Sequence, residues 1–220
     1  MRYTRFFSLL TVTLLALLAV RQTVAQGNQE AANAAKEGME ATQGKDWNRA
    51  VEAFKKASSM DEKYAPNLAA ALQQRATVYM SQQKFPEAIG DYTQAIKIKA
   101  DGDTLERRAY ALMQMKDYDH ALGDYTEAIK LEPKDPKPYL LRSYILELKG
   151  DVKNGIADCD SVLKLQANNP EAMSRKMRLQ KRAQLASQAT PPPMPNGPIA
   201  NPALQKAATA TPTPAAPAKP

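Results

Sequence analysis

Apolar, small and polar positions follow one another with a helical period along the central part of the chain. Apolar or aromatic residues separated by three, four or seven positions predict the buried face of an amphipathic helix. The segment GDYTQAIKI at 90–98 has this spacing, and a near copy, GDYTEAIKL, follows 33 residues later at 123–131. A near repeat at this interval indicates a helical unit that is built more than once.

Four units align on the small residue that follows a short polar turn. These anchor residues are spaced by 38, 33 and 34 positions: Ala50, Ala88, Ala121 and Gly155. An apolar residue follows each anchor on the same helical face: Phe54, Tyr92, Tyr125 and Cys159. A small residue precedes each anchor on an earlier helix: Gly38, Ala76, Ala109 and Ser143. Each unit is therefore predicted to be a helix, a tight turn and a second helix. Because one such pair cannot bury its own apolar face, the units are expected to stack.

The breaks in the pattern divide the chain into segments. Prolines and the Ala100–Gly102 stretch separate the units, since neither proline nor glycine continues a helix readily. The predicted repeat domain covers 26–169, with units at 31–64, 69–101, 102–135 and 136–169. A basic capping helix is predicted at 170–188.

The second and third units, ATVYMSQQKFPEAIGDYTQAIKI and AYALMQMKDYDHALGDYTEAIKLEP, resemble the tetratricopeptide repeat in period and in their pattern of small and aromatic residues. The first and fourth units match less well, since Ala41 and Gly155 replace more usual residues. The resemblance implies an all-α solenoid of about four helix–turn–helix repeats with a C-terminal capping helix. It also implies that the first helix of each unit lines a concave binding surface.

Three arginines precede three aspartates by 16 positions, with the arginine on a predicted first helix and the aspartate on the second. The pairs are Arg75 with Asp91, Arg108 with Asp124, and Arg142 with Asp158. The first unit has Glu37 and Ala53 at these places, so both partners are missing together. This correlation predicts structural ion pairs, either within a unit or between neighbouring units. Three copies of one pair favour architecture over an active site.

The predicted groove residues lie on the face of each first helix that points away from the repeated small residues. They are Met39, Gln73, Thr77, Met80, Glu106, Tyr110, Met113, Leu140, Tyr144 and Glu147. Methionine and tyrosine are adaptable contact residues, so a peptide or partner protein is the expected ligand. The alternative is that several of these residues pack against the next unit.

The resemblance also allows this chain to be compared with a specialised groove of the family. Some proteins of this family hold the acidic C-terminus of chaperones in a carboxylate clamp made of Lys and Asn side chains. The corresponding positions in this chain are Ala35, Met39, Gln74, Asp103 and Arg107, of which only Arg107 suits a clamp. A carboxylate clamp is therefore not expected.

The first 25 residues have the features of a secretory signal peptide. Two arginines precede the uncharged apolar run at 6–20, and Thr23 and Ala25 satisfy the small-residue requirement of a cleavage site after Ala25. The alternative is a retained membrane anchor, although the apolar run is shorter than the roughly 20 residues that span a bilayer. The expected location is therefore exported, either periplasmic or secreted.

The net charge of +7 comes from the ends of the chain, because the segment 26–170 carries more acidic than basic residues. A nucleic-acid partner is not expected, since it would require a basic face on the folded domain. The tail at 189–220 holds ten of the 16 prolines and is expected to be disordered. The alternative function is a peripheral membrane or cell-wall adaptor that docks through the basic helix 171–183 and this tail. The apolar stripe of the basic helix 171–183 is short, so contact of this helix with a membrane is the less favoured alternative.

Few residues suit catalysis. His120 is the only histidine and Cys159 the only cysteine, and the sequence contains no glycine-rich phosphate-binding loop. A metal site needs several histidine, cysteine or clustered carboxylate ligands. The sequence therefore predicts a protein that is not an enzyme and has neither metal nor cofactor.

Overall fold

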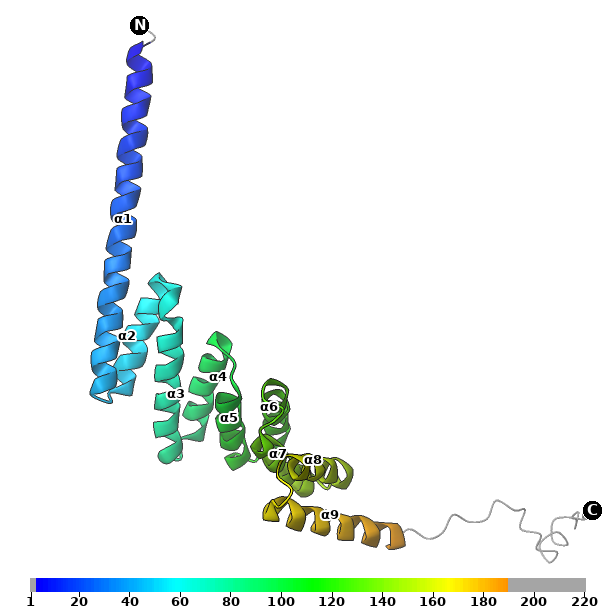
Figure 1. Cartoon of the computed structure of the whole chain (residues 1–220). Helices are drawn as coiled ribbons and strands as arrows, with labels where there is room; N and C mark the ends of the chain where they lie inside the picture. Colours follow the sequence, from blue (N-terminus) through cyan, green and yellow to red (C-terminus); the bar gives the residue numbers. More distant parts are fainter. Residues whose placement is uncertain (1–2, 190–220) are drawn as a thin grey trace, which may run out of the picture. The chain divides into compact units, whose positions relative to one another are not determined.

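The computed structural model describes the backbone of residues 3–189 and the side chains of residues 21–188. Within this part every regular element is a helix, which confirms the predicted all-α class (Figure 1). The elements are α1 (Tyr3–Gln43), α2 (Trp47–Met60), a short 3-10 helix η1 (Glu62–Tyr64), α3 (Ala65–Ser81), α4 (Phe85–Ile98), α5 (Gly102–Gln114), α6 (Tyr118–Leu131), α7 (Pro136–Lys149), α8 (Val152–Leu165) and α9 (Pro170–Ala189).

Consecutive helices pack against each other from α1 to α8. The helices of each pair (α1 and α2, α3 and α4, α5 and α6, α7 and α8) lie side by side and are joined by a tight turn (Figure 1). Each second helix also packs on the first helix of the next pair. This is the stacked arrangement of helix pairs that the repeat pattern predicts, and it buries apolar faces that no single pair could cover.

The tight turns share one backbone conformation at the position five residues before each anchor. Lys45, Gln83, Lys116 and Gly150 have positive φ values of 57°, 59°, 60° and 78°. A left-handed residue commonly ends a helix because it lets the chain turn sharply, and glycine adopts this conformation without a steric penalty. Only the fourth unit places glycine there. The repeat is therefore preserved in the backbone even where the residue type changes.

Aspartates begin most of the helices that follow a turn. The carboxylates of Asp46, Asp101, Asp117 and Asp151 each accept a hydrogen bond from a backbone N–H in the first turn of α2, α5, α6 and α8. Such caps satisfy donors that a helix start leaves unpaired. The helix α4 lacks a side-chain cap and has proline in its first turn instead, where no N–H is needed.

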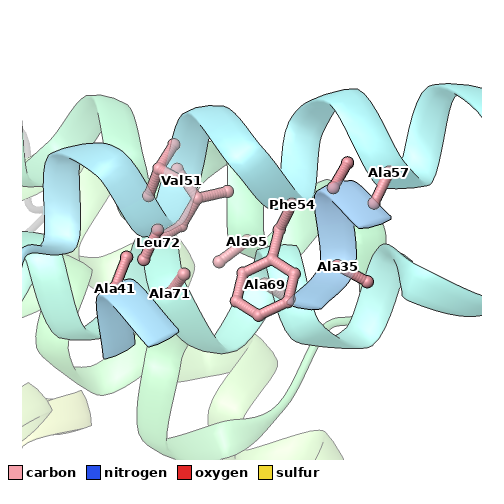
Figure 2. Close-up of a cluster of buried hydrophobic side chains, with 11 residues drawn as sticks. Ala35, Ala41, Val51, Phe54, Ala57, Ala69, Ala71, Leu72 and Ala95 are labelled. Atoms are coloured by element: carbon pink, nitrogen blue, oxygen red, sulfur yellow. The ribbon is translucent and has the colours of Figure 1, made fainter. Parts of the chain in front are cut away.

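Small anchor residues and large apolar residues form the core. Ala50, Ala88 and Ala121 are fully buried, as are Tyr92 and Tyr125 in the second and third units. Figure 2 shows the cluster in the first two units, where the Phe54 ring lies among alanines from neighbouring helices. A Cβ atom at Gly38 would lie 2.8 Å from this ring. Glycine at this small-residue position therefore lets α1 approach α2 closely.

Two predicted boundaries differ from the observed helices. The predicted second unit starts at 69, but α3 begins at Ala65, because Pro66 occupies its first turn rather than ending the preceding segment. The predicted first unit starts at 31, but α1 runs without a break from Tyr3. The first fully buried residue among those with described side chains is Ala31. The predicted disordered tail lies outside the described residues, except for Ala189 at the end of α9.

Candidate binding groove

A pocket of about 320 Å³ opens between the first helices of the second, third and fourth units. It is lined by Thr77, Met80, Tyr92, Asp103, Glu106, Arg107, Tyr110, Lys137 and Leu141. Four of these residues (Thr77, Met80, Glu106 and Tyr110) belong to the predicted groove set. The helices α3, α5 and α7 thus bring together groove residues from different units, as the resemblance implies.

Tyr92 of α4, which belongs to the predicted core, also lines the pocket. The four remaining lining residues were not in the predicted groove set, although the repeat register could have indicated them. Asp103 and Lys137 occupy equivalent positions near the starts of α5 and α7, and Arg107 and Leu141 are equivalent one turn later. Each is on the first helix of a unit, on the side that faces the preceding first helix. Comparing the side chains of adjacent units, rather than one helix at a time, would have found them.

A second pocket of about 460 Å³ lies at the N-terminal pair and α3. Its lining includes the predicted groove residue Met39, together with Trp47, Phe54 and the amides of Asn67 and Gln74. Met39 is exposed, so it is accessible to a ligand. The sequence analysis placed Gln74 at a clamp position, and here its neutral amide lines a mainly apolar surface.

Two predicted groove residues are used for packing between helices. The Gln73 side-chain amide donates hydrogen bonds to Thr104 Oγ1 at 2.6 Å and to Asp101 Oδ2 at 3.2 Å, and so ties α3 to the start of α5. Met113 is half-buried against the third-unit core, where its sulfur accepts a hydrogen bond from the Tyr125 hydroxyl at 3.4 Å. Both side chains therefore take part in packing, as the alternative describes, and their role as groove contacts stays a prediction.

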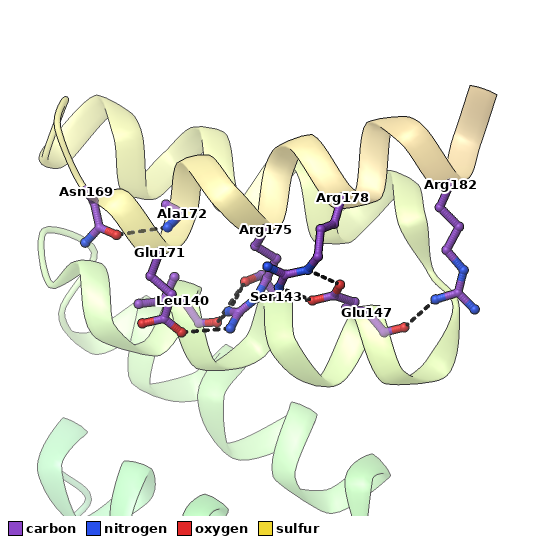
Figure 3. Close-up of polar contacts among 9 residues, drawn as sticks. All are labelled: Leu140, Ser143, Glu147, Asn169, Glu171, Ala172, Arg175, Arg178 and Arg182. Atoms are coloured by element: carbon purple, nitrogen blue, oxygen red, sulfur yellow. Dashed lines mark hydrogen bonds and ion pairs between the residues drawn. The ribbon is translucent and has the colours of Figure 1, made fainter. Parts of the chain in front are cut away.

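The capping helix α9 contacts the predicted groove residues Leu140 and Glu147 of the fourth unit (Figure 3), and it also contacts Tyr144. Arg178 donates two hydrogen bonds of 3.1 Å to the Glu147 carboxylate, and Arg175 donates to the Leu140 carbonyl oxygen. The Arg175 guanidinium also lies over the Tyr144 ring, 5.3 Å from its centre. Leu140, Tyr144 and Glu147 therefore form the seat of the cap, although Tyr144 is still 38% exposed, and their role as ligand contacts stays a prediction.

Contacts with the fourth unit also pair or bury much of the positive charge of α9. Arg175 is buried, Lys176 pairs with Asp160 at 2.6 Å, and Arg182 donates to the Glu147 carbonyl oxygen at 3.1 Å. The Arg178 guanidinium holds the pKa of the Glu147 carboxyl below its ordinary value. The basic character of this helix thus serves its attachment to the fourth unit, which weakens the case for a basic docking surface.

The three arginine–aspartate pairs are formed, each within one unit. Arg108 donates from Nε and Nη2 to the two oxygens of Asp124 at 2.8 and 2.6 Å. Its third nitrogen, Nη1, donates to Thr93 Oγ1 of the preceding unit at 3.0 Å. Arg75 with Asp91 and Arg142 with Asp158 repeat the two-pronged bond. Each arginine thus joins the two helices of its own unit and also contacts the preceding second helix.

His120 and Cys159 lie apart from the pocket between α3, α5 and α7. His120 is exposed at the start of α6, where its Nδ1 lies 2.8 Å from an Asp117 oxygen and where this carboxylate raises the pKa of the imidazole. Cys159 is buried, and burial raises the pKa of its thiol, which disfavours the nucleophilic thiolate. Among the described residues, no group of histidine, cysteine, aspartate and glutamate side chains could hold a metal ion.

Glu106 is the buried charge of the pocket between α3, α5 and α7. Its side chain is almost fully covered, and Lys137 Nζ lies 2.5 Å from its Oε2 oxygen. Burial raises the pKa of the Glu106 carboxyl, while Lys137 opposes part of this shift. The pocket thus combines aromatic and apolar walls with one carboxylate that is poorly solvated.

Within residues whose side chains are described, no helix is long and apolar enough to cross a membrane.

The repeated helix pairs, turns and caps define a solenoid of helical hairpins. The family model of the tetratricopeptide repeat matches residues 102–135, which are α5, α6 and the turn after them. This match identifies a tetratricopeptide repeat in the third unit, and the structural similarities below show that the described helices have the fold of a tetratricopeptide-repeat solenoid. A search of curated protein sequences gave no match.

Several solved structures are similar to this chain. The TPR domain of Arabidopsis OM64 is 25% identical with a TM-score of 0.50, over 53% of this chain and 98% of that domain. The first TPR of Spaghetti (RPAP3), bound to the HSP90 peptide SRMEEVD, is also 25% identical with a TM-score of 0.50, over 53% of this chain and 93% of that one. The TPR protein YrrB is 15% identical with a TM-score of 0.56, over 74% and 83% of the two chains, and supports the fold alone.

Proposed function

We propose that this protein is a non-catalytic interaction scaffold that binds a peptide or an extended segment of a partner protein in the groove along α3, α5 and α7. The pocket between these helices carries the proposal. It combines Tyr110, which is 48% exposed, with Met80 and Leu141 and with polar groups at its rim. Aromatic and methionine side chains beside a few polar groups are typical of peptide-binding surfaces.

The similarity to the first TPR of RPAP3 supports peptide binding, because that protein was solved with an HSP90 peptide. The side chains that recognise the peptide need not be shared. At the positions of the carboxylate clamp this chain has Ala35, Met39, Gln74, Asp103 and Arg107. We therefore propose a groove of the same general kind with a different ligand preference.

A matched pair of tyrosines tests the groove. Peptides that bind the purified chain are first selected from a random displayed library. Their affinity is expected to fall about tenfold when Tyr110 is replaced by alanine (Tyr110→Ala), since an aromatic anchor at an interface contributes about 1.4 kcal/mol or more. Tyr144 occupies the equivalent position in the fourth unit but lies under Arg175 of the cap. Tyr144→Ala is therefore expected to leave the affinity within about twofold. Isothermal titration calorimetry measures both.

Two results would contradict the groove assignment. One is an unchanged affinity in Tyr110→Ala, and the other is binding that disappears only when residues 189–220 are deleted. The second result would favour the adaptor alternative, in which the tail makes the contact. Circular dichroism of each variant controls for folding.

We also propose that the scaffold is exported. The features at residues 1–25 support a cleaved signal, and cleavage after Ala25 would remove none of the described buried residues, which begin at Ala31. Mass spectrometry of the protein from its native cells is expected to find Gln26 at the N-terminus. An intact Arg2 or Arg5 in the isolated protein would contradict cleavage.

A further inference from the structure

One carboxylate oxygen in the pocket between α3, α5 and α7 lacks a hydrogen-bond partner. Glu106 is 6% exposed, and its Oε2 is buried with no donor in hydrogen-bonding geometry. The residue lines the same pocket as Tyr110 and Leu141. Burial of a carboxylate without full hydrogen bonding is unfavourable, and such groups are rare in folded proteins. Glu106 can therefore accept a hydrogen bond from a ligand that enters the pocket.

The positive group nearest to this oxygen is easily displaced. Lys137 Nζ lies 2.5 Å from Glu106 Oε2, so the two groups form an ion pair. The angle of this contact does not meet the criteria for a hydrogen bond. The Lys137 side chain is 63% exposed, so its ammonium can move into water, and a cationic ligand group that takes its place keeps the buried Glu106 carboxylate paired. A cationic ligand group could replace it without breaking a buried hydrogen bond.

The remaining charges of the pocket decide which sign of ligand is favoured. Arg107 donates from Nε to Asp103 at 2.7 Å, so its charge is already matched. An anionic ligand would have to compete with Asp103 for Arg107 and with Glu106 for Lys137. A cationic ligand would instead compete only with the exposed Lys137, and it could donate to Glu106 Oε2 with the hydrogen-bond geometry that Lys137 does not meet. The exposed aromatic ring of Tyr110 adds a surface of the kind that attracts cations.

We propose that Glu106 makes this pocket a seat for one cationic side chain, lysine or arginine, of the bound peptide. The inference rests on the proposed groove function and assigns Glu106 as the residue that holds the cationic side chain of the peptide. A volume of about 320 Å³ is at the lower end of the range for small-ligand sites, which suits one long side chain. Asp103, a carboxylate at one of the clamp positions, also favours a cationic ligand. A carboxylate clamp has the opposite preference, because it binds an acidic chain end.

The charge preference can be tested without any partner protein. The probes are n-butylguanidinium and n-butylammonium, which represent the two cationic side chains, and n-butyrate as the anionic control. They are titrated into the full chain at pH 8 while the backbone amide signals of Glu106, Tyr110 and Thr77 are followed by nuclear magnetic resonance. We expect saturable shifts with at least one cation in the millimolar range and none with butyrate. The two cation arms show whether the seat prefers guanidinium or ammonium.

Variants link the shifts to the carboxylate. Glu106→Gln keeps the side-chain shape and is expected to weaken cation binding by about tenfold, the effect of losing a hydrogen bond to a charged group. It should fold normally, because burial already disfavours the charge at this position. Glu127→Gln, which changes an exposed carboxylate on α6, is the matched control and should have no effect. Lys137→Met removes the competing ammonium and should strengthen cation binding.

Three outcomes would overturn the inference: no saturable shift with either cation, equal shifts with butyrate, or unchanged cation binding in Glu106→Gln. Weaker cation binding in Lys137→Met would also overturn it. These outcomes are separate from those of the peptide experiment. Peptides that bind through Tyr110 but tolerate norleucine in place of every lysine and arginine would contradict the cationic seat alone. Cation binding at Glu106 without any groove-binding peptide would contradict the scaffold function alone.

Discussion

Replacing Tyr125 by alanine is expected to lower the free energy of unfolding by about 3–5 kcal/mol. The Tyr125 side chain is fully buried and packs with Ala109, Leu112 and Ile145 from neighbouring helices. Removing the ring loses its burial and leaves a cavity that rigid helices fill only in part. The hydroxyl also loses its hydrogen bond to Met113, which is the lesser effect. Chemical denaturation followed by circular dichroism measures the change.

Tyr110 is the matched control for this experiment, since it is the same residue type in the same unit but is about half exposed. Tyr110→Ala is expected to change stability by less than about 1 kcal/mol. Similar losses in the two variants would show that Tyr125 does not lie in the seam between the third and fourth units. The contrast would also confirm that the affinity loss of Tyr110→Ala is not a folding defect.

The second large effect is expected from the Arg108–Asp124 pair. Asp124→Ala should destabilise the protein by about 3 kcal/mol, because it leaves the Arg108 guanidinium partly buried without its carboxylate. This value is at the lower end for buried pairs, because about a fifth of the Arg108 side chain is exposed. A double-mutant cycle with Arg108→Ala should give a coupling energy of about 2 kcal/mol. The two-pronged geometry is what distinguishes this pair from an ordinary surface contact.

The Arg49–Glu37 pair of the first unit serves as the comparison. It forms at 3.0 Å between side chains that are about half exposed, 56% and 50%. The same cycle at this pair should give a coupling energy below about 1 kcal/mol, since solvent screens exposed charges. A cycle on Arg108 and Asp124 with no more coupling than this would remove the claim that the pair holds the third unit together.

The experiments on Tyr125 and on the Arg108–Asp124 pair both test contacts that hold the helices of the groove in position. In a stacked repeat, each unit contacts only its neighbours, so a defect in the third unit disturbs α5 and its contacts with α3 and α7. The pocket takes its walls from these three helices and from Tyr92 of α4. We therefore expect groove binding to depend on the seam residues indirectly, through folding, and on Tyr110 and Glu106 directly.

The amino-acid sequence by itself determined the fold class, the repeat and the paired positions of the ion pairs. The reason is that these features depend on local periodicity, since helical spacing places Tyr92 and Tyr125 on buried faces. The correlated spacing of Arg108 and Asp124 identified partners because the same geometry recurs in three units. Boundaries were less certain where proline can either end or begin a helix, as at Pro66.

Only the tertiary structure decided which exposed-face residues remain available to a ligand. Ten positions fitted the groove pattern, yet Gln73 is bound to the next unit and Glu147 to the cap, because partners far along the chain determine their surroundings. The same holds for Glu106, whose burial comes from packing against neighbouring units and whose partner, Lys137, comes from the next unit. Helical periodicity specifies the face on which a side chain lies. Whether that side chain meets water, a neighbouring unit or an unfilled pocket depends on how the units stack.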